Sequence, residues 1–211
     1  MPGGPCAETA IFKACCPMLD LCDFTREYLP EAGRIALKLW GGEVPDMPPE
    51  LRAVIYEYLP RYYFDEKSSC NLAVLKNGCL QALLLASSAP PEPLEANAWL
   101  QQNLPPGCAD YARSYREYLD GNRRLEDRFR SKGDVVLLFF ASIRPGCGKL
   151  LMEEFIRRAR NEQRSNMLLW TDNTCNYQYY FEHDFQLLQQ QKADPGLPGL
   201  ALETLIFRRS F

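Results

Sequence analysis

Residues 134–156, DVVLLFFASIRPGCGKLLMEEFI, narrow the choice of fold more than any other part of the chain. The nearly continuous apolar run at 134–143 is typical of a strand that is covered on both faces of a sheet. Two glycines interrupt the run, and apolar residues then recur at every fourth position, at Leu151, Phe155 and Ala159, which predicts a helix. A strand, a glycine turn and a helix start together form a common phosphate-binding arrangement.

The predicted elements around this stretch alternate between helices and hairpins. In chain order they are a strand at 9–15, a helix at 23–40 that Pro30 interrupts or restarts, a helix at 48–64, a hairpin at 71–88, helical pieces within 94–130 with breaks at 105–107 and Gly121, a strand at 134–143, a helix from Gly148, a strand at 166–172, a short helix within 173–185 and a closing hairpin. Asn77-Gly78 marks the first hairpin, because both residues readily adopt the positive φ of a two-residue turn. The sequence predicts an α/β fold with a mixed, mostly antiparallel central sheet and flanking helices.

Composition limits the class of partner. The 211 residues are 46% hydrophobic and 24% charged, with a net charge of −3, as in a soluble globular domain. The small negative charge gives no electrostatic reason for nucleic acid or an anionic membrane to be the partner. No apolar stretch is long enough to span a bilayer, and the N-terminus lacks the pattern of a signal peptide, so we expect a cytoplasmic protein.

Nine cysteines and one histidine raise the question of a metal site. Cys6, Cys15, Cys16 and Cys22 lie close together in sequence, but no C-x-x-C pair occurs and the histidine, His183, is far away. We therefore expect free thiols in a reducing compartment and no metal. A thiol redox or metal-binding protein remains an alternative function for a chain with this many cysteines.

The turn at 144–149 does not match the nucleotide-binding motifs. A P-loop needs glycine at the position of Ile143 and a hydroxyl side chain at the position of Leu150. A dinucleotide fingerprint needs a third glycine at the position of Leu151. These mismatches argue against a nucleotide as the ligand of this turn.

A general anion site and a plain strand-to-helix turn both remain open from these residues alone. Gly146, Cys147, Gly148 and Lys149 would place unpaired N–H groups at a helix N-terminus, and Arg144 adds positive charge. The same setting would lower the pKa of the Cys147 thiol and make it reactive. The preferred interpretation of Cys147 is a small residue that fits the turn.

Two segments of the predicted helical region have structural interpretations. The spacing of Tyr111, Tyr115 and Tyr118 indicates a packing face rather than a base-stacking platform. Residues 123–132, RRLEDRFRSK, are locally basic, but two acidic residues interrupt them, one of which is Glu126. This segment is interpreted as a solvated helix face.

Residues 134–185 resemble the GNAT superfamily of acyl-CoA-dependent N-acyltransferases. In that superfamily a long strand enters a Q/R-x-x-G-x-G/A turn and then a helix, and SIRPGCGKLLMEEFIRRA has this order. The next strand is typically followed by N-x-x-A and Y-E-K-x-G-F, which NTCNYQYYFEHDF resembles. Counting back from Phe185 places Tyr180 on the family tyrosine and Asn173 on the family asparagine.

The resemblance implies a single GNAT-like domain over residues 1–211. Residues 134–185 would form its coenzyme-binding core, while a helical extension at about 14–64 and a helical insert at about 89–133 would shape the acceptor side. The implied activity is an N-acetyltransferase, in which an amine of a small molecule or protein attacks acetyl-CoA directly, without an acyl-enzyme. The sequence leaves open whether the protein is a homodimer.

The resemblance also implies roles for particular residues. Tyr180 would protonate the departing thiolate, although packing in an aromatic core is its other interpretation. Asp172 is the best-placed candidate for the base, with Asp65 and Glu66 weaker. The residues implied to hold acetyl-CoA, through the turn amides, the strand edge and one side-chain amide, are Ala141, Ser142, Ile143, Arg144, Gly146, Cys147, Gly148, Lys149 and Asn173.

Three departures from the family pattern accompany the match. The turn reads R-x-G-x-G, which is one residue shorter than the family spacing. Asn176 stands where alanine is common, and Asp184 replaces the glycine that usually precedes Phe185. Because a shorter turn offers fewer amides, a non-catalytic acyl-CoA-binding or degenerate member of the same fold is a second hypothesis.

Overall fold

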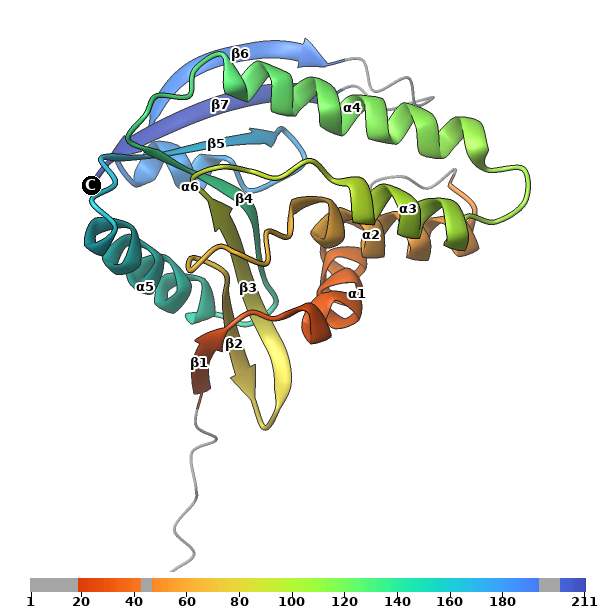
Figure 1. The fold of residues 1–211 in the computed structure, drawn as a ribbon, viewed down its shortest axis with the longest axis horizontal. Coiled ribbons are helices and arrows are strands. Elements are labelled where there is room, and N and C mark those ends of the chain that lie inside the picture. Colours follow the sequence, from red (N-terminus) through yellow and green to blue (C-terminus); the bar gives the residue numbers. More distant parts are fainter. Residues whose placement is uncertain (1–18, 43–46, 194–201) are drawn as a thin grey trace, which may run out of the picture.

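The computed structural model describes residues 19–42, 47–193 and 202–211. Its elements are β1 (Leu19–Asp23), η1 (Arg26–Tyr28), α1 (Leu29–Trp40), α2 (Pro49–Tyr63), β2 (Leu72–Lys76), β3 (Cys79–Ser87), α3 (Leu94–Asn103), α4 (Ala109–Asp127), β4 (Asp134–Ser142), α5 (Cys147–Asn161), β5 (Asn166–Asp172), α6 (Gln178–Glu182), β6 (Gln186–Ala193) and β7 (Leu202–Ser210). They form a seven-stranded sheet of order β1-β2-β3-β4-β5-β7-β6 (Figure 1). Among these described strands, β4 and β5 are the only pair that runs parallel. The predicted mixed, mostly antiparallel sheet with flanking helices is confirmed.

Helices cover both faces of the central strands. In Figure 1, α5 lies on one side of β2, β3 and β4, and α1 and α2 lie on the other. Along β4, Val136 and Leu138 belong to the core under α1 and α2, whereas Val135 and Leu137 belong to the core under α5. Because both faces of β4 are buried, almost every residue of this strand is apolar.

The first predicted hairpin is confirmed. The first predicted helix, at 23–40, is confirmed only from Leu29 onward, because Asp23 ends β1 and Arg26–Tyr28 form η1. Asn77 and Gly78 have φ values of 53° and 77°, as a two-residue hairpin turn requires. Pro30 lies in the first turn of α1, where its missing N–H costs no helical hydrogen bond, so it restarts the helix. The predicted strand at 9–15 lies outside the described residues.

The predicted break at Gly121 is wrong, because α4 continues through it to Asp127. A glycine inside a helix costs only about 1 kcal/mol relative to alanine. Leu119 and Leu125, on either side of Gly121, are buried, and burial of such side chains is worth roughly 1.5–3 kcal/mol each. Packing therefore outweighs the local preference. The predicted break at 105–107 is confirmed, since α3 ends at Asn103 and α4 begins at Ala109.

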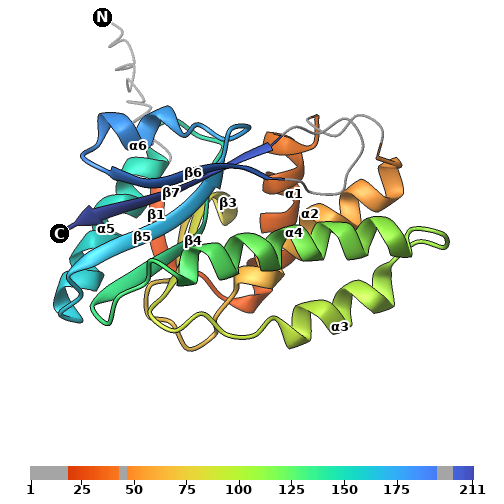
Figure 2. The same cartoon turned by 90° about the horizontal axis from the view of Figure 1, so that it is seen from above.

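The insert that carries α3 and α4 lies beside α2. Figure 2 shows these three helices next to one another, with α4 running along the half of the sheet formed by β5, β7 and β6. Hydrogen bonds from two α2 tyrosines fix this arrangement: Tyr58 Oη donates to Asn97 Oδ1 at 2.8 Å, and Tyr62 Oη donates to Asp120 Oδ1 at 2.6 Å.

The strands β4 and β5 separate after a short paired segment. Asp134–Val136 pairs with Asn166–Leu168, and beyond Val136 the strand β4 pairs only with β3. In Figure 1, β5, β7 and β6 run across the top while β2 and β3 descend away from them. At the end where β4 and β5 pair, the buried carboxylate of Asp134 on β4 accepts a hydrogen bond from Arg208 of β7 at 2.9 Å. The sheet therefore opens between β4 and β5 on the side where both strands end.

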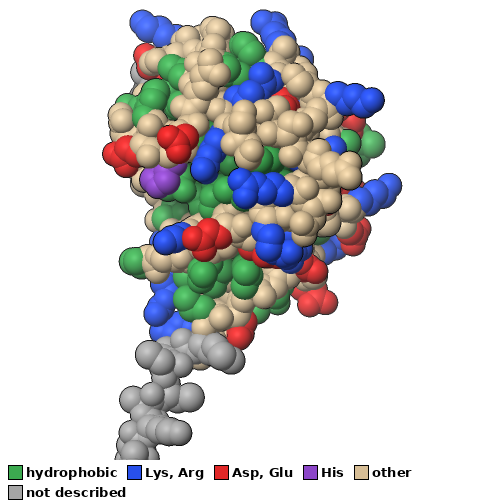
Figure 3. Space-filling view, turned by 90° about the vertical axis from the view of Figure 1, so that its left-hand side faces the viewer, with side chains coloured by type: hydrophobic (Ala, Val, Ile, Leu, Met, Phe, Trp, Pro, Cys, Tyr) green, Lys and Arg blue, Asp and Glu red, His purple; other side chains and the backbone are tan. Residues whose placement is uncertain are grey.

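The face that carries α5 has a mixed charge. Figure 3 shows Lys and Arg side chains on this face alongside Asp and Glu. Two basic residues of α5 share one carboxylate, because Arg157 and Arg158 contact Glu154 Oε1 at 2.6 and 2.8 Å. Within the described ranges, no helix has the length and apolar character needed to cross a membrane.

Replacing Asp184 by glycine is expected to stabilise the protein by about 0.5–1 kcal/mol. Asp184 has a φ of 62°, a left-handed conformation that strains any residue with a Cβ, and its side chain is exposed. The free energy of unfolding from urea titration measures the effect. Glu182→Gly is the matched control: because Glu182 is the last helical residue of α6, this change should destabilise by up to about 1 kcal/mol. A loss of stability in Asp184→Gly would contradict the strain argument.

Candidate active site

A large cavity lies in the opening between β4 and β5. Its volume is about 1080 Å³, and its wall includes residues of α1, α2, α4, β4, α5, β5, α6 and β7 together with the turn that joins β4 to α5. Clefts that hold one small ligand usually measure roughly 300–1,000 Å³. This cavity is therefore as large as the largest of these clefts.

The two glycines of the β4–α5 turn serve different purposes. Gly146 precedes α5 with a φ of 84°, which glycine adopts without strain. A Cβ on Gly146 would meet no atom within 4 Å, whereas a Cβ on Gly148 would approach Phe140 Cζ to 3.2 Å. The first glycine sets the backbone conformation, and the second lets the start of α5 pack closely on β4.

Backbone N–H groups at the start of α5 lie in the cavity wall without a protein partner. The Cys147 N–H donates to the Arg144 carbonyl oxygen at 3.3 Å and closes the turn. In the described part of the chain, the N–H groups of Gly146, Gly148 and Lys149 have no hydrogen-bond acceptor. These three residues line the cavity, as does Arg144. Unpaired donors and positive charge at a helix N-terminus suit a phosphate group.

Only part of the predicted strand edge faces the opening. The Ile143 N–H donates to the Gln81 carbonyl oxygen at 3.0 Å, so the Ile143 N–H is not available to a ligand. Because hydrogen-bonding directions alternate along a strand, Ala141 also points its main chain toward β3, where it pairs with Leu83. The main chain of Ser142 faces the opening, and so does that of Phe140, which was missing from the predicted set.

Tyr180 both packs in an aromatic core and reaches the cavity, so the structure agrees with packing and leaves a role as proton donor possible in its position. Its ring packs on Phe185 and Phe207, with ring centroids 5.0 and 5.3 Å away, and the residue also lines the cavity. Burial raises the pKa of Tyr180 well above the usual value for tyrosine, with a smaller contribution from Cys175. The hydroxyl therefore stays protonated across the neutral range and can act as a donor.

Asp172 lies in the cavity wall at the end of β5. Its Oδ2 accepts a hydrogen bond from Tyr118 Oη at 3.1 Å, and its Oδ1 accepts bonds from the Thr174 N–H at 3.0 Å and Thr174 Oγ1 at 2.5 Å. These donors fix the orientation of the carboxylate. The weaker candidates for the base, Asp65 and Glu66, are not among the cavity-lining residues.

Two residues predicted to hold the coenzyme lie outside the cavity wall. Asn173 Oδ1 accepts a hydrogen bond from the Glu203 N–H at 2.9 Å, which fastens the end of β5 to β7, and Asn176 lines the cavity instead. Cys147 is fully buried in the core under α5, and burial raises the pKa of its thiol. The reactive-thiol hypothesis for Cys147 is therefore wrong, because desolvation outweighs the charge of Arg144.

The helix α4 carries the residues that sequence reasoning missed. Tyr115 and Tyr118 pack as predicted, but they also line the cavity. Glu126, predicted on a solvated face, is only 2% exposed. Glu126 lies eight residues after Tyr118, so the two share one helix face. This spacing could have predicted that Glu126 is buried. The basic residues around Glu126 led instead to the interpretation of a solvated face.

The positions of the cysteines and of His183 bear on the alternative of a thiol redox or metal-binding protein. Among residues 19–42, 47–193 and 202–211, no group of three or more His, Cys, Asp or Glu side chains is placed to hold a metal ion. Cys22 lies in β1, whereas Cys6, Cys15 and Cys16 lie outside the described residues. His183 caps the end of α6, with Nδ1 2.7 Å from the Tyr179 carbonyl oxygen.

Comparison with known proteins gives similarity in structure but not in sequence. No family profile matches this chain, and no curated protein matches it. Similar solved structures include the C-terminal condensation domain of Ebony in complex with beta-alanyl-dopamine (11% identity, TM-score 0.62), an acetyltransferase of the GNAT family from Staphylococcus aureus (11%, 0.52) and the PaiA N-acetyltransferase from Thermoplasma acidophilum in complex with coenzyme A (11%, 0.52). Each alignment covers 92% of this chain and 99% of the other. The chain therefore has the fold of the GNAT acetyltransferases.

Proposed function

We propose that this protein is an N-acetyltransferase that transfers an acetyl group from acetyl-CoA to an amine. The observation that supports this most is the meeting of three features in one cavity: unpaired N–H groups at the start of α5, the unpaired edge of β4 beyond Val136, and the protonated Tyr180. The shared fold agrees with it, since one structural neighbour is an N-acetyltransferase in complex with coenzyme A.

The donor set of the cavity fits acetyl-CoA. The N–H groups of Gly146, Gly148 and Lys149 would bind the pyrophosphate, and the side chains of Arg144 and Lys149 would add positive charge. The main chain of Ser142 would pair with the extended pantetheine arm, in the way that a peptide adds a strand to an exposed sheet edge. Pro145 supplies no N–H, so the shortened turn offers fewer donors than the family spacing would.

The proposed reaction needs one proton donor and one proton acceptor. The substrate ammonium first loses a proton to Asp172 or to water, and its neutral nitrogen attacks the thioester carbonyl carbon. A C–N bond forms, the C–S bond breaks, and Tyr180 gives its proton to the sulfur, so that coenzyme A leaves as a thiol. The new amide nitrogen then loses its extra proton, which restores the tyrosine hydroxyl through water. The net products are the acetamide, coenzyme A and one proton.

Reversing the charge of Lys149 is expected to weaken acetyl-CoA binding about tenfold at low salt, or roughly 1.4 kcal/mol. Lys149 lies in the cavity wall and is exposed, so a glutamate there would repel the coenzyme phosphates. Because salt screens exposed charges, the effect should shrink in high salt. Arg160→Glu is the matched control, since Arg160 is an exposed basic residue at the far end of the same helix.

Isothermal titration of the wild type with acetyl-CoA tests the proposal itself. If the wild type does not bind acetyl-CoA at millimolar concentration, both the N-acetyltransferase proposal and the non-catalytic acyl-CoA-binding alternative are refuted. The thiol redox or metal-binding hypothesis would then remain. Equal affinities for Lys149→Glu and Arg160→Glu would place the coenzyme phosphates away from the start of α5. Binding without turnover of any amine would favour the non-catalytic alternative, for which the shortened turn is the specific observation.

A further inference from the structure

We infer that Tyr118 is a positioning residue for the proposed acetyl transfer, and that Asp172 Oδ2 is the atom that takes the proton from the substrate ammonium. The Tyr118 hydroxyl donates to Oδ2 and would hold the carboxylate with one lone pair of that oxygen directed at the substrate. The inference rests on the proposed function and deepens it, because it chooses Asp172 over water as the proton acceptor.

Two carboxylates line the cavity in the described part of the chain, and one of them lies beside the proposed phosphate site. Glu153 Oε1 is 3.8 Å from Lys149 Nζ, and both side chains are largely exposed near the start of α5. Asp172 lies instead at the end of β5, on the other strand of the opening. Asp172 is therefore the carboxylate available to an ammonium that enters away from the coenzyme phosphates.

The hydrogen bonds of Asp172 leave capacity on one oxygen. A carboxylate oxygen accepts about two hydrogen bonds. Oδ1 receives the Thr174 N–H at 3.0 Å and Thr174 Oγ1 at 2.5 Å, whereas Oδ2 receives the Tyr118 hydroxyl at 3.1 Å. One lone pair of Oδ2 therefore remains. In the proposed step an N–H bond of the ammonium breaks, the proton bonds to Oδ2, and the resulting acid later releases it to water.

Two hydrogen bonds join α4 to the neighbouring strands at this point. Asp172 and Thr204 lie directly opposite each other on β5 and β7, and Tyr118 and Asn122 are one turn apart on α4. Tyr118 donates to Asp172, and Thr204 Oγ1 donates to Asn122 Oδ1 at 2.7 Å in a fully buried bond. The four residues therefore form a closed arrangement, which fixes Tyr118 Oη relative to the carboxylate.

Asn122 also limits the direction in which the Tyr118 hydroxyl points. Burial, followed by the charge of Asp172, raises the pKa of Tyr118, and the nearby Asn122 amide acts in the opposite direction. The Asn122 Nδ2 group has no complete hydrogen bond among the described residues, so it remains a donor close to Tyr118. A donor on that side of Oη disfavours a second hydrogen there, and the hydroxyl hydrogen is directed at Asp172.

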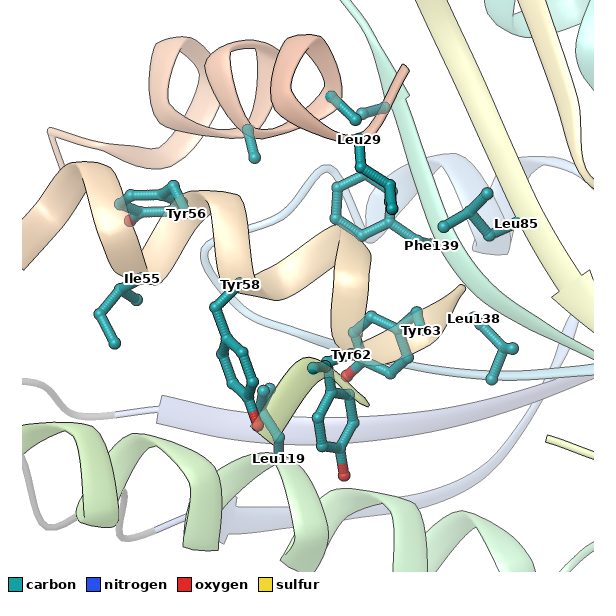
Figure 4. Close-up of a cluster of buried hydrophobic side chains, with 14 of the residues drawn as sticks. Leu29, Ile55, Tyr56, Tyr58, Tyr62, Tyr63, Leu85, Leu119, Leu138 and Phe139 are labelled. Atoms are coloured by element: carbon teal, nitrogen blue, oxygen red, sulfur yellow. The ribbon is translucent and has the colours of Figure 1, made fainter. Parts of the chain in front are cut away.

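Packing on either side of Tyr118 leaves its ring little freedom. The ring of Trp170, two residues before Asp172 on β5, meets the Tyr118 ring edge-on with centroids 5.9 Å apart. Leu119, the next residue of α4, is buried in the same core as Tyr58, and Figure 4 shows these two side chains close together. A side chain fixed in this way can hold a catalytic group to within roughly 0.5 Å.

A double-mutant cycle with Tyr118→Phe and Asp172→Asn tests the inference. The measurement is kcat/KM with acetyl-CoA and whichever of butylamine, spermidine and lysinamide the wild type acetylates fastest, with chromatographic detection of coenzyme A. Asp172→Asn should lower kcat/KM at least about 100-fold, as loss of a positioned base does. Tyr118→Phe should lower it about tenfold, because one hydrogen bond to a charged group is lost. In the Asp172→Asn background, Tyr118→Phe should change it less than about twofold.

Tyr111→Phe is the matched control. It removes a buried hydroxyl from the same helix, outside the cavity wall, and kcat/KM should stay within about twofold of the wild type. Calorimetry with acetyl-CoA should give Tyr118→Phe the same coenzyme affinity as the wild type, because the proposed positioning acts on the acceptor side of the reaction.

Each outcome decides the inference separately from the proposed function. Equal losses from Tyr118→Phe in both backgrounds would overturn it and leave acetyl transfer intact, because a purely structural role does not depend on the carboxylate. Full turnover in Asp172→Asn would also overturn it, with water as the proton acceptor. If the wild type acetylates none of the three amines, the same cycle is measured on hydrolysis of acetyl-CoA, where coupling between the two changes supports the inference and additive effects overturn it. A wild type with neither activity refutes the proposed function, and the inference with it.

Discussion

Replacing Tyr180 by phenylalanine is expected to lower kcat about 100- to 10,000-fold, which is the usual contribution of a positioned proton donor. The reason is that burial keeps the Tyr180 hydroxyl protonated, so it can supply the proton that the departing thiolate needs. The ring contacts with Phe185 and Phe207 remain in the variant, and the free energy of unfolding should change little. Steady-state kinetics with an amine that the wild type acetylates measures the change in kcat, and urea denaturation measures the free energy of unfolding. Calorimetry with acetyl-CoA measures the coenzyme affinity.

The loss should appear in kcat rather than in coenzyme affinity, which should stay within about twofold, because the proposed contact forms only as the thiolate departs. Tyr177→Phe is the matched control: Tyr177 immediately precedes α6 but is not among the cavity-lining residues, so its variant should keep full turnover. Unchanged turnover in Tyr180→Phe would mean that solvent protonates the thiolate. An equal loss in both variants would point to damage to α6.

Replacing Glu126 by glutamine is expected to stabilise the protein at alkaline pH, by about 5 kcal/mol at pH 9, with little change at pH 4. Desolvation raises the pKa of Glu126 to about 8, and Oε1 has no partner among the described residues. The folded state therefore holds a proton that the unfolded state releases near pH 4.5. The contribution of this carboxyl to stability is complete below that pH and is lost as pH rises toward 8, by about 1.4 kcal/mol per pH unit.

Urea denaturation of the wild type and Glu126→Gln at several pH values checks this expectation. The difference in the free energy of unfolding should grow steadily from acid to alkaline pH. Glu117→Gln is the matched control, because Glu117 is an exposed glutamate of the same helix and the substitution removes the same charge. A pH-independent difference between wild type and Glu126→Gln would show that the carboxyl titrates normally and that water reaches it.

Local patterns in the sequence were sufficient for most of the fold. The apolar run of β4, the Asn77-Gly78 turn and the fourfold spacing in α5 each predict their element, because the hydrogen bonds and turn conformations involved are local. The one wrong break, at Gly121, shows the limit of this reasoning. A local preference of about 1 kcal/mol yields to burial contributed by residues distant in sequence.

The candidate site was predicted in part. The strand–turn–helix and Tyr180 lie along the cavity, because a motif of fixed spacing carries its own geometry. The strand edge was less predictable, since only the hydrogen bond to Gln81 of the neighbouring strand shows that the Ile143 N–H is already paired. Cys147 shows the same limit: sequence places it at a helix start, which lowers a thiol pKa, but only packing shows that it is buried.

The sequence by itself determined the order of the elements, the glycine turn with its unpaired donors, and the position of the tyrosine in the short helix. These depend on backbone conformation and spacing over a few residues. Only the tertiary structure decided that β4 and β5 separate after Val136, that Tyr63 and Tyr118 line the same cavity, and that Glu126 is buried. The physical reason is that cavities and desolvation depend on which distant segments pack together, and no local pattern records that.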